Sequence, residues 1–322
     1  MVTKNQVKKI TIVTPVYNES ESLVRYHETI ERQLFGLNGY DFNVILIDDG
    51  SEDNSWDIIK KICEVDKRFS AHRLSRNMGS HIAICCGLDS ANGDAIAVLA
   101  CDLQDPPEVL LKMIERWEWG ADIVWGRRVS RNEARWRIIS SQFFAVLLKR
   151  FAMPKGSKFT TGSFLVMDAK VLSYVRKFRE HNRITFAIVA WTGFSQDVVN
   201  YERPARESGQ SGWKLASMFK AMYDAFIGFS LFPVKCITTL GVLLSVGNLL
   251  FILYLVVSWM FGDPRPGWTS LMAFNSLLFG ILFLMLGIIG EYLARIYSEV
   301  VARPLFCIRD SCGLIPQGNK LN

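Results

Sequence analysis

Short apolar runs of strand length alternate with amphipathic segments between residues 10 and 200. Each run stops abruptly at polar, turn-forming residues, as expected where a buried strand leaves a sheet. Strands are predicted at residues 10–16, 41–47, 95–100, 121–125 and 165–167. Helices are predicted between them, at residues 56–65, 82–91 and 106–119. Strands that alternate with helices predict an open α/β fold with a mostly parallel sheet.

The most informative polar residues follow the apolar run 95–100. Asp105 and Glu108 predict a capping box that starts the next helix, with Asp105 as its N-cap. Asp102 and Gln104 therefore fall between the carboxyl end of a strand and a helix, where open α/β sheets bind ligands. A carboxylate and an amide oxygen suit a hard divalent cation such as Mg²⁺, which keeps waters and substrate phosphates as further ligands. The alternative is that both polar groups only cap the loop.

Other predicted strands also end in turn-forming residues. The first ends at residues 17–19 (Tyr-Asn-Glu), and the helix after it has Ser20 or Ser22 as its predicted cap. The second ends at residues 48–51 (Asp-Asp-Gly-Ser), and a third, shorter segment ends at residues 76–79 (Arg-Asn-Met-Gly). Polar clusters at the strand ends also favour an open, mostly parallel sheet.

Positive charge follows the strand predicted at 121–125. Arg127 and Arg128 stand at its carboxyl end, and further arginines and lysines continue to residue 150. Scattered charges often form only a solvated helix face, but guanidinium groups match phosphate oxygens, so we favour phosphate binding. The Gly- and Ser-rich segment 198–212, predicted as a loop, fits either a phosphate-binding loop or a plain linker.

The hydrophobic surplus of the chain lies in its last third. Residues 213–229 have apolar positions at helical spacing and predict an amphipathic helix in a membrane interface. Residues 236–261 and 268–290 carry no charge, and each exceeds the roughly 20 residues that cross a bilayer as a helix. The polar turn 262–267 between them predicts a transmembrane hairpin. Lysines and arginines flank its outer ends, so the positive-inside rule places those ends and the soluble domain in the cytoplasm.

Composition and charge narrow the possible partners of the chain. The 322 residues are 50% hydrophobic with a net charge of +6, which suits anionic membranes or anionic substrates. We expect no nucleic-acid partner, because no dense basic run with interleaved aromatic residues occurs. The seven cysteines form no CxxC pair and are read as reduced and structural. Residues 1–9 lack the apolar core of a signal peptide.

Five motifs and the predicted hairpin then occur in a fixed order. The motifs are Pro15-Val16-Tyr17-Asn18-Glu19, Asp48-Asp49-Gly50-Ser51, Asp102-Leu103-Gln104-Asp105-Pro106-Pro107-Glu108, Thr161-Gly162-Ser163-Phe164, and Arg206 with Gly209, Ser211 and Lys214. Over nearly its full length the chain resembles the polyprenyl-phosphate glycosyltransferases of glycosyltransferase family 2. That group includes dolichyl-phosphate mannose synthase and the bacterial bactoprenol glucosyltransferases.

The resemblance implies a GT-A (Rossmann-like) domain at residues 1–212, an interfacial helix at 213–232, a transmembrane hairpin at 233–294 and a cytoplasmic tail at 295–322. The implied location is the bacterial inner membrane, multi-pass, with the catalytic domain in the cytoplasm. The implied nucleotide-sugar site consists of Pro15, Tyr17, Glu19, Ile47, Asp49, Arg206 and Lys214. The implied metal ligands, for Mg²⁺ or Mn²⁺, are Asp102 and Gln104. The implied lipid-phosphate site consists of Arg127, Arg135, Arg137 and Ser140.

Asp102 and Arg127 are the implied catalytic residues. One departure is Ala100, where many members of the family have Asp, so one carboxylate is missing from the site. The expected reaction moves a sugar, glucose first, from a UDP-sugar to undecaprenyl phosphate with inversion. Because this acceptor is already anionic, no catalytic histidine is needed.

Alternatives to this reaction remain open. The donor could instead be UDP-N-acetylglucosamine, UDP-aminoarabinose or GDP-mannose. A processive polysaccharide synthase is disfavoured, because more spans and a true Gln-x-x-Arg-Trp motif are missing. A non-catalytic membrane scaffold with a degenerate transferase fold is the third hypothesis. The predicted hairpin also offers a surface for a homo-oligomer.

Overall fold

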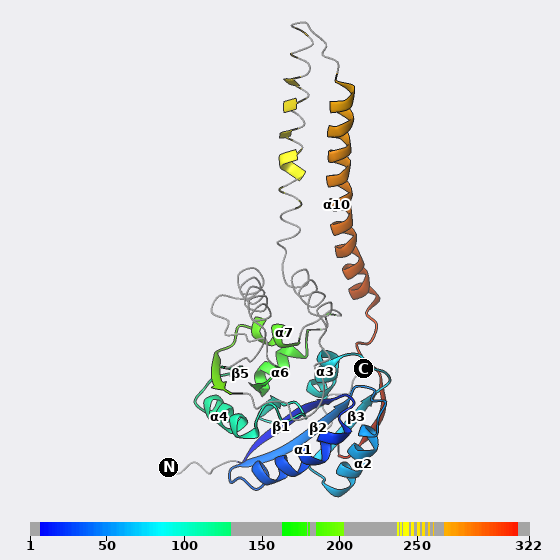
Figure 1. Ribbon diagram of the computed structural model, residues 1–322. Coiled ribbons are helices and arrows are strands. Elements are labelled where there is room, and N and C mark those ends of the chain that lie inside the picture. The colour runs from blue at the N-terminus through cyan, green and yellow to red at the C-terminus, as the bar shows by residue number, and fades with distance from the viewer. Residues whose placement is uncertain are drawn as a thin grey trace. The chain divides into compact units, whose positions relative to one another are not determined.

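The structure is a computed structural model that describes residues 7–129, 163–178, 180, 185–202 and 267–314, with scattered positions between 237 and 260 (Figure 1). The chain divides into two compact units. We call Met1–Met218 with Pro304–Asn322 the sheet unit, and Phe219–Arg303 the helical unit. Each unit is described separately.

The sheet unit contains an eight-stranded sheet with the order β7-β5-β6-β4-β1-β2-β3-β8. The strands are β1 (Lys8–Val16), β2 (Tyr40–Asp48), β3 (Phe69–Leu74), β4 (Ala95–Val98), β5 (Ile123–Arg128), β6 (Leu165–Asp168), β7 (Gln196–Tyr201) and β8 (Ile308–Cys312). Only β6 and β8 run against the other strands of this sheet. The predicted α/β fold with a mostly parallel sheet is confirmed.

Helices cover both faces of this sheet (Figure 1). They are α1 (Ser20–Gln33), α2 (Ser55–Val65), α3 (Ser80–Ser90), α4 (Pro107–Glu118), α6 (Ala169–Val175) and α7 (Thr185–Trp191). Helix α1 packs between α2 and α4, whereas α7 packs between α3 and α6. Successive strand residues point to opposite faces, so Ile12 and Leu46 join the core beneath α1 while Val13 and Ile47 meet α3. A Cβ on Gly87 of α3 would lie 2.3 Å from Val13 Cγ1, so glycine permits this close approach.

Two predicted helix caps are wrong. Helix α1 has Glu19 as its N-cap and no capping side chain of its own, so neither Ser20 nor Ser22 caps it. Helix α4 has Pro106 as its N-cap, and the predicted Asp105 cap does not form. At α1 the Ser22 hydroxyl donates to the Glu19 side chain at 2.9 Å. At α4 the Asp105 side chain accepts the hydroxyl of the distant Tyr201, a contact that local spacing does not reveal.

Two strand boundaries also differ from the prediction. Strand β4 ends at Val98, two residues before the apolar run does. Strand β7 occupies residues 196–201, so the first part of the segment predicted as a loop at 198–212 is paired with β5. The residues of β7 are only partly buried, and a half-exposed edge strand lacks the strong apolar signal of a central one.

The segment predicted as a tail, 295–322, contributes to both units. Its first residues complete α10 (Trp268–Val301), and β8 then pairs with β3 at the edge of the sheet. The sequence of β8, Ile-Arg-Asp-Ser-Cys, is largely polar and exposed, which explains why it carried no strand signal.

The helical unit contains α10, which includes the whole second predicted span, 268–290. Every described position between 237 and 260 is helical, and the ring of Phe251 packs against that of Phe274 on α10 with centroids 5.1 Å apart. Within the described residues, one segment, Leu277–Val301 of α10, is helical, long and apolar enough to cross a membrane. The first helix of the predicted hairpin, at residues 236–261, is only partly described, so the hairpin stays a prediction.

Candidate active site

A cavity of about 250 Å³ opens where β1, β2 and β4 end. Eleven residues line it: Pro15, Val16, Tyr17, Glu19, Asp49, Asn77, Gly79, Ser80, Ala100, Cys101 and Asp102. Parallel strands bring their carboxyl ends to one edge of a sheet, so residues from three separate motifs meet there. The structure thus brings five of the predicted site residues together, namely Pro15, Tyr17, Glu19, Asp49 and Asp102.

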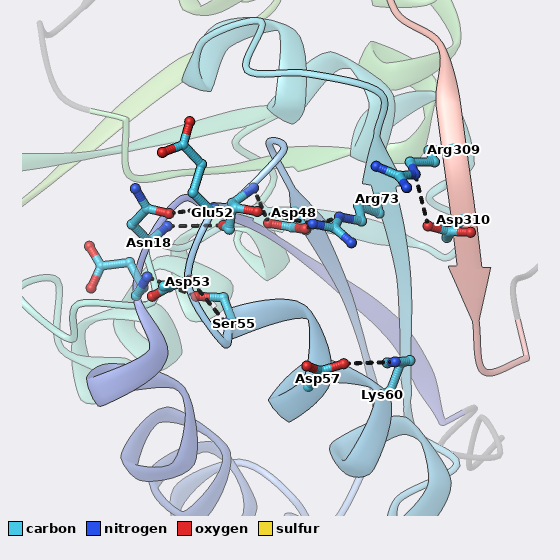
Figure 2. A network of polar contacts seen from close by, with 12 residues as sticks. Asn18, Asp48, Glu52, Asp53, Ser55, Asp57, Lys60, Arg73, Arg309 and Asp310 are labelled. Atoms are coloured by element: carbon cyan, nitrogen blue, oxygen red, sulfur yellow. Dashed lines mark hydrogen bonds and ion pairs between the residues drawn. The ribbon is translucent and has the colours of Figure 1, made fainter.

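The turn after β1 is held by the loop after β2 (Figure 2). Backbone N–H groups of residues 18–20 donate in succession to Ser51 Oγ, Ser55 Oγ and Asp53 Oδ2 at 3.0–3.1 Å. Asn18 adopts a left-handed conformation with φ of 53°, which asparagine tolerates better than most residues. These bonds supply the caps that α1 lacks, and they fix the backbone between Tyr17 and Glu19 at the cavity.

The adjacent carboxylates Asp48 and Asp49 have different roles. Asp48 is fully buried; its Oδ1 accepts the Ser51 N–H at 3.0 Å, and its Oδ2 pairs with Arg73 Nε at 3.1 Å. Asp48 therefore stabilises the turn, and Asp49 is the member of the pair that reaches the cavity.

Asp49 holds the loop that follows β3. Its Oδ1 accepts the Met78 N–H at 2.7 Å, and its Oδ2 accepts the Gly79 N–H at 2.8 Å. Burial raises the pKa of Asp49, and these two N–H groups oppose that shift. The loop lies so close that a Cβ on Gly50, which has φ of +71°, would be 2.6 Å from the Arg76 carbonyl carbon.

The sequence analysis missed the three cavity residues that follow β3, namely Asn77, Gly79 and Ser80. The available signal was the run Arg-Asn-Met-Gly at residues 76–79, which was noted as a strand end but not assigned to the site. Its contribution depends on β3 lying beside β2, a pairing that spacing in the sequence does not specify.

Asp102 lies in a tight turn beyond β4. Its Oδ1 accepts the Gln104 N–H at 3.2 Å, and Leu103 between them is left-handed with φ of 52°. A non-glycine residue in this conformation is costly and often marks a functional site. The Gln104 side chain is buried and does not line the cavity, so Asp102 alone of the two predicted metal ligands does.

Asp105 belongs to a buried cluster and does not cap α4. Its Oδ1 accepts the hydroxyl of Tyr201 on β7 and lies 3.7 Å from Arg128 Nη2. Arg128 Nε also donates to the Tyr201 hydroxyl oxygen at 3.3 Å. Burial raises the pKa of Tyr201, and the negative charge of Asp105 raises it further. The cluster ties the Asp102 loop to the ends of β5 and β7.

Arg127 and Arg128 point to opposite faces of β5, as neighbouring strand residues do. Arg128 is engaged by Asp105, while Arg127 is exposed and does not line the cavity. The catalytic and lipid-phosphate roles predicted for Arg127 stay predictions. Ile47 is fully buried against α3 behind the cavity wall. The remaining predicted site residues lie outside the described residues: Arg135, Arg137, Ser140, Arg206 and Lys214.

Three carboxylates, those of Glu19, Asp49 and Asp102, line the cavity. Burial raises the pKa of the Cys101 thiol, and the negative charges of Glu19 and Asp102 add to the shift. In the described part of the chain, no three His, Cys, Asp or Glu side chains gather into a metal site. A Mg²⁺ or Mn²⁺ ion that shares its coordination with substrate phosphates needs only one or two carboxylates. Asp102, with Glu19 and Asp49 nearby, fits that kind of site.

Comparison with known proteins identifies the class of protein. Residues 11–200 match the family model described as glycosyl transferase family 2. This match covers more than half of the chain, and the chain belongs to glycosyltransferase family 2. The α/β fold with a mostly parallel sheet is therefore of the GT-A type that the family resemblance implied.

Several relatives match over nearly the whole chain. The uncharacterized glycosyltransferase YkcC of Bacillus subtilis (strain 168) is 35% identical over 94% of this chain and 94% of its own length. The bactoprenol glucosyl transferase of Shigella phage SfII is 33% identical over 94% of this chain and 98% of its own length. Among solved structures, mannosyl-3-phosphoglycerate synthase from Rubrobacter xylanophilus is 14% identical with a TM-score of 0.48, over 67% of this chain and 71% of that chain.

Proposed function

We propose that this glycosyltransferase moves a sugar, glucose in the first instance, from a UDP-sugar to undecaprenyl phosphate in the cytoplasmic leaflet of a bacterial membrane. One observation carries the proposal: Asp49 and Asp102, from separate motifs, line one cavity at the carboxyl ends of parallel strands. The relatives named bactoprenol glucosyl transferase support the acceptor class, since they align over nearly the full chain.

The cavity suits a nucleotide diphosphate sugar. Tyr17 is 42% exposed at its wall, and a partly exposed aromatic ring is a suitable stacking surface for a base. Glu19 and Asp49 are acceptors for donor groups on the nucleoside. A divalent cation held by Asp102 would stabilise the negative charge that develops on the diphosphate leaving group.

The expected chemistry is a direct displacement. An oxygen of the lipid phosphate forms a bond to the anomeric carbon while the bond from that carbon to the UDP oxygen breaks, and its electron pair leaves with UDP. The acceptor is already ionised, so no proton has to be removed. The described residues that line the cavity include carboxylates but no histidine. Attack opposite the leaving group inverts the anomeric configuration.

The helical unit supplies the membrane attachment in this proposal. Its helix α10 has 34 residues and is about 51 Å long at 1.5 Å per residue, against roughly 30 Å for the hydrocarbon core. The first charged residues after the charge-free run, Glu291 and Arg295, form an ion pair at 3.3 Å. We propose that they mark where the helix leaves the bilayer on the cytoplasmic side. Self-association through the predicted hairpin remains part of the same proposal.

The direct test uses the purified full-length protein with undecaprenyl phosphate, Mg²⁺ and a panel of labelled nucleotide sugars. We expect a lipid-linked monosaccharide, formed best from UDP-glucose, with inverted anomeric configuration by NMR. Mass spectrometry of the lipid product identifies the sugar among the alternative donors. No transfer from any UDP-sugar or from GDP-mannose would contradict the proposal.

The rival hypothesis of a non-catalytic scaffold makes a different prediction in cells. A scaffold keeps its cellular role in the Asp102→Asn variant, because the fold and the helical unit are unchanged. An enzyme loses that role together with the lipid-linked product. The two outcomes are separated by assaying the cell-surface glycan and the protein level in the same cells.

A further inference from the structure

Strand β8 rejoins the sheet unit after the helical unit and covers an edge beside the cavity. It pairs antiparallel with β3 from Ala71 to Leu74, so β3 is not the edge strand on this side. The side chain of Cys312, the last residue of β8, contacts Cys63 of α2. The strand is therefore attached both to the sheet and to the helix that covers it.

Specific contacts hold β8 in this register. Ser311 Oγ lies 2.8 Å from His72 Nδ1, and the other ring nitrogen of His72 lies 3.1 Å from Ser90 Oγ. Gly313 follows the strand with φ of +79°, and a Cβ there would lie 2.6 Å from the Phe69 carbonyl oxygen. Only glycine fits this conformation at this distance without displacing the strand.

The residue directly before β8, Cys307, holds the loop that Asp49 also holds. Ser75 directly follows β3, and its N–H donates to the Cys307 carbonyl at 2.9 Å. Four residues further on, the Gly79 N–H donates to Asp49 at the cavity wall. Segment 75–80 is thus held at Ser75 by Cys307, which follows the helical unit in the chain. It is held at Gly79 by Asp49, a predicted donor-binding carboxylate.

A second connection reaches the other cavity turn. Arg73 of β3 lies opposite Asp310 of β8, and Figure 2 shows the two strands side by side. The Arg73 guanidinium binds the Asp48 carboxylate and donates to the Ser51 carbonyl at 3.0 Å. Displacing β8 therefore disturbs both loops that shape the nucleotide side of the cavity.

We propose that β8 is a positioning element that keeps segment 75–80 in the geometry that binds the nucleotide of the donor. Only residues 302–306 separate the end of α10 from Cys307, so the proposed membrane attachment and the proposed donor site are connected through a short piece of chain. This inference rests on the proposed function, because it takes a nucleotide sugar as the ligand of the cavity.

The test compares two glycine variants of the full-length protein. Gly313→Ala places a methyl group against β3, whereas Gly120→Ala has the same left-handed strain, with φ of +101°, but no atom within 4 Å of the added Cβ. We expect Gly313→Ala to raise both the dissociation constant for UDP and the KM for the donor about three- to tenfold, with kcat and the acceptor KM little changed. Gly120→Ala should leave the donor KM at the wild-type value.

Amide hydrogen exchange measures the effect of β8 on segment 75–80 without an activity assay. In Gly313→Ala, the amides of Ser75, Met78 and Gly79 should exchange faster than in the wild type, because the first loses the Cys307 acceptor and the others become less well held on Asp49. Unchanged exchange at these amides in a variant whose β8 amides exchange faster would overturn the proposal.

Two substitutions of Ser311 test the same proposal with a smaller disturbance of β8. Ser311→Ala removes the hydrogen bond to His72, whereas Ser311→Thr retains the hydroxyl. The donor KM should rise in the first variant and return to the wild-type value in the second. A lower Tm or kcat with an unchanged donor KM would mean that β8 is merely structural. If the wild type binds no UDP, the proposed donor is wrong, and the exchange experiment still decides whether β8 controls the loop.

Discussion

Large apolar side chains are buried in the sheet unit and exposed in the helical unit. Leu46 in β2 has no exposed surface, whereas Leu286 in α10 is 50% exposed and Phe283 is 68% exposed. A water-soluble protein rarely leaves so many large apolar side chains uncovered along one helix. This contrast is what the proposed membrane attachment predicts, with water around the cavity and lipid around α10.

Charged side chains are also distributed differently in the two units. In the sheet unit, carboxylates such as Asp48 and Asp49 are buried and satisfied by backbone N–H groups or by Arg73. In α10, the charged residues occur only beyond the apolar run, from Glu291 onward. In the proposed function, the sheet unit binds the substrates and the helical unit attaches the protein to the membrane.

The largest expected effect is a loss of sugar transfer that leaves membrane attachment unchanged. Asp102→Asn should lower transfer about 100- to 1,000-fold, because it removes a carboxylate that would hold the cation against the diphosphate. Initial rates with labelled donor measure the loss, and a membrane-pelleting assay should show unchanged attachment. The exposed residue Asp41 on β2 gives a matched control, since Asp41→Asn should retain full activity.

The next prediction compares the effect of a Leu→Ala substitution on stability in the two units. Leu46→Ala removes a fully buried side chain and should destabilise the sheet unit by about 2–5 kcal/mol. Leu286→Ala removes a half-exposed side chain and should change the Tm of the sheet unit very little. Thermal unfolding in detergent, followed by circular dichroism, measures both. Equal losses of stability would contradict the contrast between the two units.

A charge placed on α10 tests which solvent surrounds it. Leu286→Arg should disfavour insertion by about 2.5–3.5 kcal/mol if this position lies near the middle of a bilayer. The fraction of protein that resists carbonate extraction from membranes should fall. Leu314→Arg, at a residue of the sheet unit that is 73% exposed, makes the same chemical change and should leave extraction unaltered.

The smallest effect is a pH dependence confined to the sheet unit. Burial lowers the pKa of His72 and of His81, so the folded chain keeps both neutral where the unfolded chain, with a histidine pKa of about 6.5, takes up protons. The unfolded state binds more protons in that window, so this contribution to stability is complete above about pH 6.5 and is lost as the pH falls below it. We expect Tm to fall by a few degrees in mild acid.

The variant His72→Gln should flatten this pH dependence, because one of the two buried imidazoles is gone. Residues 219–303 contain no histidine, so membrane attachment should not change over the same pH range. A profile identical to that of the wild type would mean that His72 titrates alike in the folded and unfolded chains.

The amino-acid sequence by itself determined the fold class and which motifs stand at the strand ends. Apolar runs that stop at acidic turns predicted parallel strands, and the ends of parallel strands share one edge. The cavity accordingly contains Tyr17, Asp49 and Asp102, as expected from their motifs alone. The charge-free run from residue 268 likewise predicted a long apolar helix, because its composition excludes a water-exposed one.

Only the tertiary structure decided which groups those motifs use as partners. The N–H groups at the start of α1 donate to Ser51, Ser55 and Asp53, and Asp105 binds Tyr201 across 96 positions of the chain. Strand β8 carries almost no apolar signal and is recognisable only by its pairing with β3. Such contacts depend on which strands become neighbours in the sheet. The packing of the whole sheet sets the order of the strands, because local spacing along the chain specifies periodicity and not pairing.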